Sequence, residues 1–333
     1  MPARRAPLDL LASLGGLRAV LEVLREVDVR PAQLAAERPF TLIVVSRDLP
    51  LAEHLVRLLY QGDRAEDVPS HRAAIALPLD AAVALARADV ALIVAAAHLD
   101  FAEERRIQQA LAAAGIPVRL CLLAEGTAPG EGVWLPTING VLDEREAVRC
   151  IVQAVREMGA VSDLALARHL PAFRAPVVRA LIDDVASANL AYSLGTAVLE
   201  VNPVTGLPLN VADVVVLTKN QGVMAYKIAL AMGLPSDFRH IAPQLVGVIG
   251  GGFLLRQLAR SLVGLIPAVG ALTKVAVAFA GTYVVGEAVY RWCATGERLS
   301  EEALLLIYAR ALERGRALLA RLRRLRLPSR RAA

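Results

Sequence analysis

The chain has 333 residues, of which 56% are hydrophobic and 21% are charged. This length suits two domains, and the high apolar content excludes intrinsic disorder as the main state. Aromatic residues make up only 4% of the chain, which excludes a nucleic-acid surface built on aromatic stacking.

The net charge of +5 is concentrated at one end of the chain. Residues 301–333 hold nine arginines against three glutamates, whereas the remaining 300 residues are nearly neutral. We therefore expect an electrostatic partner to meet the C-terminal tail.

Cysteine usage and the N-terminus bear on the compartment. Cys121, Cys150 and Cys293 stand at long, irregular spacings, which predicts neither a disulfide framework nor a cysteine metal site. Charged residues interrupt the apolar residues near the N-terminus, so we expect no signal peptide. Both features predict a cytoplasmic location for the α/β part and the tail.

Residues 8–28 carry a leucine stripe. Spacings of four and three alternate along it, which places these side chains on one side of a helix: Leu10, Leu14, Leu17, Leu21 and Leu24. The stripe spans two heptads. It suits a helix packed across a neighbouring domain or a dimer seam.

Residues 40–158 alternate short apolar runs with amphipathic ones. The apolar runs predict buried strands at Phe40–Ser46, Arg72–Pro78, Val90–Ala97 and Val118–Leu123, with an edge strand at Val133–Ile138. The amphipathic runs predict helices at Leu51–Tyr60, Asp80–Ala88, Phe101–Ala114 and Asp143–Met158. This βαβα order predicts a mostly parallel sheet covered on both faces.

This order of elements resembles the G domain of translation-factor-type GTPases, which implies a Rossmann-like domain. The nucleotide-binding motifs of that family are missing. The first strand runs into Ser46-Arg47-Asp48 in place of GxxxxGK[ST], residues 77–83 lack the glycine of DxxG, and residues 122–126 differ from NKxD. We therefore expect a degenerate, G-domain-like domain that does not hydrolyse nucleotide.

Open α/β sheets bind ligands at the carboxyl ends of their strands. Ser46, Arg47 and Asp48 are therefore weak candidates for an anion site, with His98 and Asp100 near them. The alternative is that they are solvated loop residues. The five histidines match no spacing that a catalytic triad requires, so we expect no catalytic residue, no metal and no cofactor.

Beyond Gly159 the pattern is almost entirely helical. Helices are predicted at Pro176–Val198, Val211–Met232, Ile241–Leu262, Ala268–Thr295 and Glu301–Leu327. The second of them carries a polar band, which argues against a lipid-spanning helix: Asp213, Lys219, Asn220, Gln221 and Lys227. The band suits a solvated stripe or a buried polar network with Asp183 and Asp184.

Residues 175–295 resemble the bacterial domain-of-unknown-function family 697. The resemblance rests on Asn202-Pro203, Leu207-Pro208 and Asp213, on Leu-Thr-Lys-Asn-Gln at 217–221 and on Ile266-Pro267. That family is often fused to, or encoded with, GTPase domains and is frequently considered membrane-associated. The resemblance therefore implies a membrane context and a GTPase partner, and no particular chemistry.

Residues 241–290 predict an apolar, glycine-rich hairpin. Their uncharged runs at Ile241–Leu255, Ser261–Thr273 and Val275–Gly286 are each shorter than the ~20 residues that span a bilayer. Gly247 and Gly251 have the spacing that lets helices approach closely. The hairpin suits partial insertion into lipid or burial in a protein core.

The last predicted helix begins after Ser300, which can cap it, with Glu301 and Glu302 in its first turn. Its arginines form a candidate basic surface for an anionic membrane: Arg310, Arg314, Arg321, Arg323, Arg324 and Arg326. The alternative is a solvated helix end. No nucleic-acid reader motif accompanies the charge, so no nucleic acid is expected.

Taken together, the patterns predict four segments: an N-terminal amphipathic helix at 1–38, a degenerate GTPase-like α/β domain at 39–159, a helical module at 160–299 and a basic helix and tail at 300–333. The expected role is a non-catalytic adaptor or regulator on the cytoplasmic side of the bacterial inner membrane. The alternatives are a nucleotide-binding enzyme with an unorthodox phosphate site and a soluble, cytoplasmic homo-oligomeric scaffold.

Overall fold

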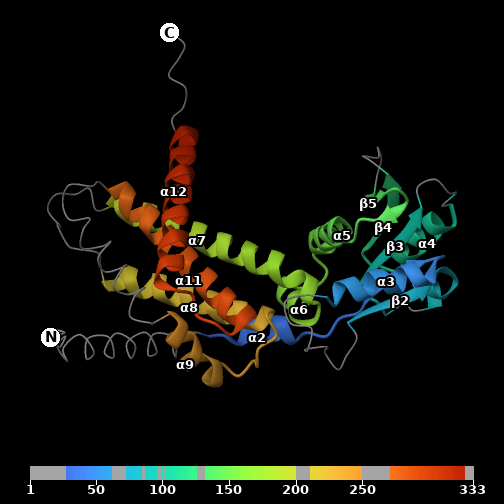
Figure 1. Cartoon of the computed structure of the whole chain (residues 1–333), viewed down its shortest axis with the longest axis horizontal. Coiled ribbons are helices and arrows are strands. Elements are labelled where there is room, and N and C mark those ends of the chain that lie inside the picture. Colours follow the sequence, from blue (N-terminus) through green and yellow to red (C-terminus); the bar gives the residue numbers. More distant parts are fainter. Residues whose placement is uncertain are drawn as a thin grey trace, which may run out of the picture. The chain divides into compact units, whose positions relative to one another are not determined.

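The computed structural model describes residues 28–61, 73–84, 87–96, 100, 102–125, 132–199, 211–249 and 271–326 (Figure 1). Two compact units are distinguished. The sheet unit consists of Arg30–Val177 with Leu230–Gly233, and the helical unit contains the described residues of Val178–Ala229 and Leu234–Ala333. The sheet unit thus continues past residue 159. The leucine stripe expected on a helix over 8–28 lies outside the described residues.

The sheet unit is built on six strands in the order β2-β1-β3-β4-β5-β6. The first five pair in parallel, and β6 pairs antiparallel to β5. Their bounds are Leu42–Ser46 (β1), Ala74–Pro78 (β2), Val90–Ala96 (β3), Val118–Glu125 (β4), Val133–Ile138 (β5) and Val141–Leu142 (β6). The mostly parallel sheet is confirmed, and β5 keeps the predicted bounds.

The helices of this unit are α2 Arg30–Glu37, α3 Leu49–Leu59, η1 Leu79–Ala84, α4 Ala102–Ala113, α5 Glu144–Met158, α6 Asp163–His169 and η2 Pro171–Phe173. Of these, α3, η1 and α4 connect strands, α2 precedes β1, and the others follow β6. In the described part of the helix predicted over Asp80–Ala88, residues Leu79–Ala84 form a 3₁₀ helix. Its i→i+3 bonds wind a short connection more tightly than an α-helix does. The short helices α6 and η2 were not predicted.

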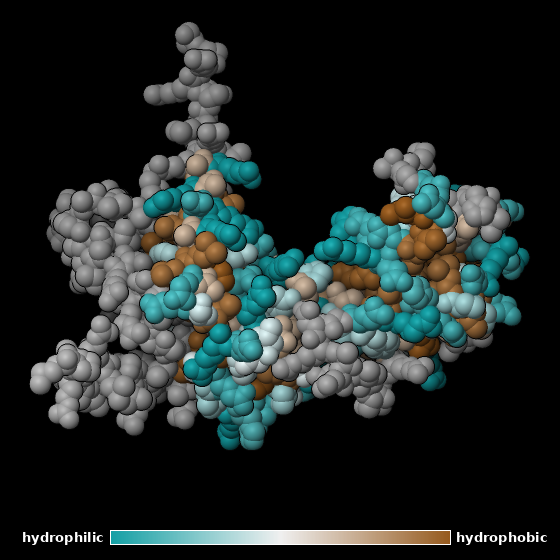
Figure 2. All heavy atoms as spheres, viewed as in Figure 1, coloured by the Kyte–Doolittle hydropathy of each residue, from teal (hydrophilic) through white to brown (hydrophobic). Residues whose placement is uncertain are grey.

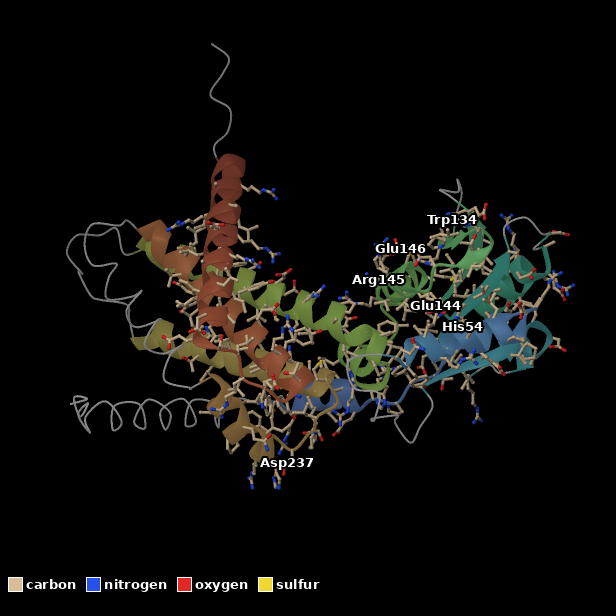
Figure 3. All side chains as sticks on the ribbon, viewed as in Figure 1. His54, Trp134, Glu144, Arg145, Glu146 and Asp237 are labelled. Atoms are coloured by element: carbon tan, nitrogen blue, oxygen red, sulfur yellow. The ribbon has the colours of Figure 1, made fainter. Side chains whose placement is uncertain are left out.

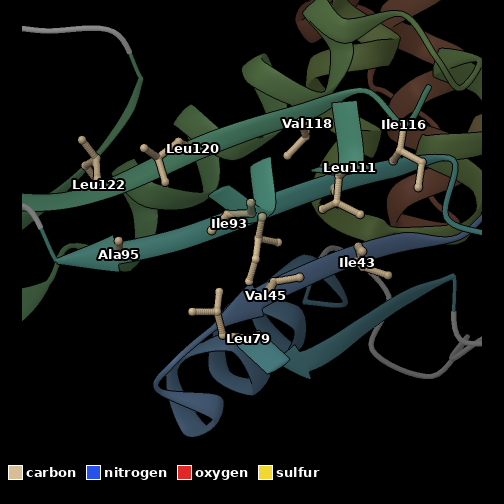
Figure 4. Packing of buried hydrophobic residues seen from close by; sticks show 12 residues of the cluster. Ile43, Val45, Leu79, Ile93, Ala95, Leu111, Ile116, Val118, Leu120 and Leu122 are labelled. Carbon is tan, nitrogen blue, oxygen red and sulfur yellow. The ribbon is translucent and has the colours of Figure 1, made fainter. Parts of the chain in front are cut away.

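Alternate residues of the central strands face opposite sides of the sheet. On one side, Ile43, Val45 and Ile93 pack with Ile107 and Leu111 of α4 (Figure 4). Helix α3 packs on β1 and β2 and contacts α5. The chain therefore leaves β1 for a helix on one face and leaves β3 for a helix on the other. Adjacent strands that diverge in this way form the switch point of a doubly wound sheet.

Helix starts in this unit carry side-chain caps. Asp48 accepts the Leu51 amide at 3.2 Å before α3, and Asp143 accepts the Glu146 amide at 3.2 Å before α5. Such caps satisfy amides that have no partner inside the helix, and each is worth about 1 kcal/mol.

The helical unit contains most of α7 and α8, whose full bounds are Arg174–Leu199 and Val211–Ala231. It also contains α9 (Phe238–Ile249), α11 (Ala271–Thr295) and α12 (Glu301–Arg326). The predicted all-helical character is confirmed for the described residues. The motif at 202–208 and the middle of the apolar hairpin, residues 250–270, lie outside them. In the part of the chain that the structure describes, no helix is long and apolar enough to cross a membrane.

Glycines allow close packing between these helices. A Cβ built on Gly286 of α11 would lie 2.6 Å from Ile182 Cγ1 of α7, and one on Gly315 of α12 would lie 3.2 Å from Phe279 Cδ1. Both glycines are therefore positions where α11 meets a neighbouring helix with no room for a side chain. Gly251 of the predicted Gly247–Gly251 pair lies outside the described residues.

Helix α8 ends on a glycine in the left-handed region. Gly233 has φ +85°, its amide donates to Leu230 O at 3.0 Å, and the Leu234 amide donates to Ala229 O at 3.0 Å. This pair of bonds is a Schellman motif, which satisfies the last carbonyls of a helix. Arg168 donates to Leu230 O at 3.2 Å from α6, so the end of α8 is also held by a positive charge.

Candidate functional site

The switch point between β1 and β3 is where a doubly wound sheet would bind a ligand. Ser46, the last residue of β1, is 3% exposed, and its hydroxyl donates to Val94 O of β3 at 3.1 Å. The same hydroxyl accepts the Asp48 amide at 3.2 Å, and Asp48 in turn caps α3. The polar groups of Ser46 and Asp48 are thus engaged in holding the end of β1 and the start of α3.

Arg47, in the turn between β1 and α3, forms ion pairs with the helix that follows β3. Its Nε lies 2.7 Å from Glu104 Oε1, and its Nη2 lies 2.9 Å from Glu104 Oε2 and 3.3 Å from Glu103 Oε2. The two glutamates stand in the first turn of α4, and the Glu104 side chain is only 3% exposed. The hydrogen bond with Glu104 raises the pKa of the Arg47 guanidinium. The predicted anion-binding charge is therefore bound by carboxylates of its own chain.

His98 and Asp100 were expected near Ser46, Arg47 and Asp48. His98 lies outside the described residues. Asp100 accepts the Ala102 amide at 3.0 Å and so holds the start of α4.

Two surface hollows of about 570 and 680 Å³ occur on the sheet unit, one beside Arg119 and Gly132 and the other along α5. The residues that line them include none of Ser46, Arg47 or Asp48.

The ion pair between Arg47 and Glu104 gives a testable stability effect. R47Q is expected to lower the urea midpoint of the chain, because a nearly buried carboxylate loses its charged partner. The double variant R47Q/E104Q is expected to regain most of the loss, because two amides can hydrogen-bond without an unpaired charge. Equal midpoints for wild type and R47Q would contradict this role for the pair.

Sequence reasoning missed a second cross-link in this unit. His54 Nε2 lies 2.8 Å from Glu144 Oε1, and Arg57 Nη2 lies 3.3 Å from His54 Nδ1 (Figure 3). The pair joins α3 to α5 across 90 residues of sequence, so no local pattern could have indicated it. Both ring nitrogens are engaged, which leaves His54 holding two helices together rather than acting as a base.

The polar band of α8 enters a buried network in the helical unit. Asn189 of α7 and Thr282 of α11 are both fully buried, and Asn189 Nδ2 donates to Thr282 Oγ1 at 2.9 Å. Asn220 donates to Asn189 Oδ1 at 2.7 Å, and Gln221 donates to Thr282 Oγ1 at 3.2 Å. Thr282 completes the network by donating to Ala278 O at 2.9 Å. One hydroxyl thus accepts two bonds and donates one, which uses its full capacity.

This polar node, defined by Asn189, Asn220, Gln221 and Thr282, joins α7, α8 and α11. A satisfied polar network inside an apolar core disfavours other helix registers, because a slip would leave its members unpaired. The band was predicted, but its expected partners Asp183 and Asp184 do not take part in the bonds described above. Lys219 and Lys227 of α8 are half-buried, and the Asp213 side chain lies outside the described residues.

Asp183 instead binds one arginine of the predicted basic surface. Arg314 Nη1 lies 2.8 Å from Asp183 Oδ1, and its Nη2 donates to Asp183 Oδ2 at 3.0 Å. The guanidinium also stands 5.6 Å from the centre of the Tyr283 ring. Arg314, one of the arginines of the predicted basic surface, therefore helps to hold α12 to α7. Arg310 and Arg321 are exposed, and the side chains of Arg323, Arg324 and Arg326 lie outside the described residues.

Glu287 of α11 makes the helical unit sensitive to pH. Burial raises the pKa of its carboxyl, and Arg179 and Arg291 offset that effect only in part. Because the folded pKa lies above the unfolded value of 4.5, the stability contribution of Glu287 is complete below 4.5 and is lost as pH rises through the folded value. E287Q is therefore expected to raise the melting temperature at neutral pH and leave it unchanged near pH ~4. An equal change at both pH values would contradict this assignment.

Reactive groups are scarce among the described residues. No group of three His, Cys, Asp or Glu side chains there is placed to hold a metal ion. Burial raises the pKa of Cys121 to about 12 and also raises the pKa of Cys150. Both thiols are therefore protonated at neutral pH, and neither offers a thiolate for catalysis. Comparisons with family models, curated proteins and solved structures find no match for this chain.

Proposed function

We propose that the protein is a non-catalytic adaptor or regulator that works at the cytoplasmic face of the bacterial inner membrane. Its parts are a degenerate, GTPase-like α/β domain and a glycine-rich helical module with a basic tail. The observation that carries the proposal is the ion pairing of Arg47 with Glu103 and Glu104. These pairs occupy the cation of the switch point with carboxylates of the same chain.

The strand order supports the finer fold assignment in this proposal. A parallel sheet in the order 2-1-3-4-5, with helices on both faces, is one of the two common orders of doubly wound, Rossmann-like domains. Phosphate binding in such domains needs backbone amides at a glycine-rich turn. The turn after β1 reads Ser46-Arg47-Asp48, and its three side chains already have partners in the chain. A nucleotide-binding enzyme at this turn is therefore the weaker alternative.

The helical module supports the regulatory half of the proposal. We infer that residues 175–295 belong to the family that their motifs resemble and that the partner is a GTPase. The polar node and the glycine contacts fix the register of α7, α8 and α11. A helical module of fixed shape, in a chain whose α/β domain has an internally paired switch point, suits a docking role better than a catalytic one.

Binding of the arginine-rich tail to lipid vesicles tests the membrane part of the proposal. The full chain is expected to sediment with phosphatidylglycerol vesicles and not with phosphatidylcholine vesicles. Replacing Arg323, Arg324 and Arg326 by glutamine should weaken binding by about 100-fold, since each cation near an anionic surface contributes ~1 kcal/mol. A matched control replaces three exposed arginines of the sheet unit and should bind as wild type: Arg87, Arg106 and Arg145. Equal binding to both vesicle types would contradict the proposal.

A further inference from the structure

Helix α12 presents an outer ridge that no neighbouring helix of the described unit covers. Six residues lie along it, all of them exposed: Glu302, Leu306, Arg310, Glu313, Ala317 and Arg321. Their spacings of four, four, three, four and four keep them within about 100° of one another around the helix. The opposite side of α12 carries Ala311 and Leu319, which are buried against α11 and α7.

The ridge carries an exposed leucine in its N-terminal half, at Leu306. Leu306 is 53% exposed and the adjoining Leu305 is 41% exposed, so the described part of α12 carries two exposed large apolar side chains. Figure 2 shows apolar and hydrophilic side chains interleaved along α12. Covering these leucines with a partner helix would remove apolar surface from water.

When two copies of the ridge run in opposite directions, the acidic residues of one copy face the basic residues of the other. Read forward, the ridge is acidic, apolar, basic, acidic, apolar and basic. When a second copy runs antiparallel, Glu302 faces Arg321, Leu306 faces Ala317 and Arg310 faces Glu313. A two-fold axis produces each of these contacts twice. A parallel arrangement would instead place each charge against its own kind, which disfavours that pairing.

We propose that the outer ridge of α12 is a homodimer interface, in which two copies of the chain pair their α12 helices antiparallel. This inference goes beyond the membrane role proposed above and does not depend on it. Two ridges of 20 residues are ~30 Å long and bury less than the ~1,200–2,000 Å² of a standard stable interface. The dimer is therefore weak, with a dissociation constant on the order of micromolar.

The complementarity permits a charge-swap test in the full chain, by sedimentation equilibrium over a range of concentrations. Wild type is expected to rise above its monomer mass of 35.5 kDa toward twice that value. R310E and E313R alone should each remain monomeric, because each places like charges against one another. An equimolar mixture of the two should recover the dimer: the introduced carboxylate faces the introduced guanidinium, and the native Arg310 faces the native Glu313.

Two further variants complete the design. The double variant R310E/E313R should form homodimers like wild type, because the swap keeps every pairing. R316E changes the charge of an exposed residue of α12 outside the ridge and should leave the dimer unchanged. All substituted side chains are exposed, so circular dichroism should show an unchanged helix content.

Three results would overturn the proposal. The first is a wild-type mass that stays at 35.5 kDa up to ~100 µM, since a micromolar dimer would be largely formed there. The second is self-association that R310E and E313R leave intact. The third is a monomer whose binding to anionic vesicles is lost in R310E, because the ridge would then face a membrane and not a second copy.

Discussion

Thr282→Val is expected to lower the free energy of unfolding by about 2–3 kcal/mol, because a buried donor left without an acceptor costs ~1–3 kcal/mol. Valine keeps the shape of threonine and removes only the hydroxyl at the centre of the polar node. Asn189 Nδ2 and Gln221 Nε2 then lose their common acceptor. Asn189 is fully buried, so its amide is out of reach of bulk water.

Thr282→Ser is the matched control for this prediction. Serine keeps the hydroxyl and loses one methyl group, so the cost should stay near ~1 kcal/mol. Chemical denaturation of the full chain measures both variants. If valine and serine cost the same, the hydroxyl contributes nothing and the node does not specify the packing of α7, α8 and α11.

Gly286→Ala should destabilise the chain by about 1–3 kcal/mol, even though alanine is the better helix former by ~0.5–1 kcal/mol. The added Cβ would lie 2.6 Å from Cγ1 and 3.1 Å from Cγ2 of Ile182. Both carbons are attached directly to the β-carbon of Ile182, so the side chain cannot turn away without meeting its own helix. Steric overlap therefore outweighs helix propensity at this position.

Gly195→Ala supplies the control for that substitution. Gly195 is an exposed residue of α7 with nothing within 4 Å of its added Cβ. The same chemical change should there raise stability by ~0.5–1 kcal/mol through helix propensity alone. Thermal denaturation of both variants gives the comparison, and a shift of the same sign in both would contradict the close contact between α7 and α11.

The strands of the sheet unit were predictable from sequence because buried parallel strands are continuous apolar runs. β1 and β3 stand out for this reason. The sequence predicted a helix at Asp80–Ala88 without its type, since alanine-rich sequence suits both α and 3₁₀ helices, and Leu79–Ala84 forms the 3₁₀ type. Helix α6 has seven residues, too few to show a helical period.

The position of the candidate site was predictable from sequence, but the pairing of its arginine with glutamates was not. Topology placed Ser46, Arg47 and Asp48 at the end of the first strand, as the structure has them. Arg47 is bound by Glu104, which lies 57 residues further along the chain. Local sequence patterns do not reveal contacts between residues so far apart in sequence. In the same way, the polar band of α8 left a solvated stripe and a buried network with Asp183 and Asp184 both open. Its partner Asn189 is a single amide within α7, which no local pattern singles out.

The most direct test of the closed switch point is calorimetry of the full chain with GTP and with ATP, each in the presence of Mg²⁺. The bridge from Arg47 to Glu103 and Glu104 predicts no heat of binding up to about millimolar nucleotide. Micromolar binding of either nucleotide would contradict the account, because it would mean that the switch point opens and accepts phosphate.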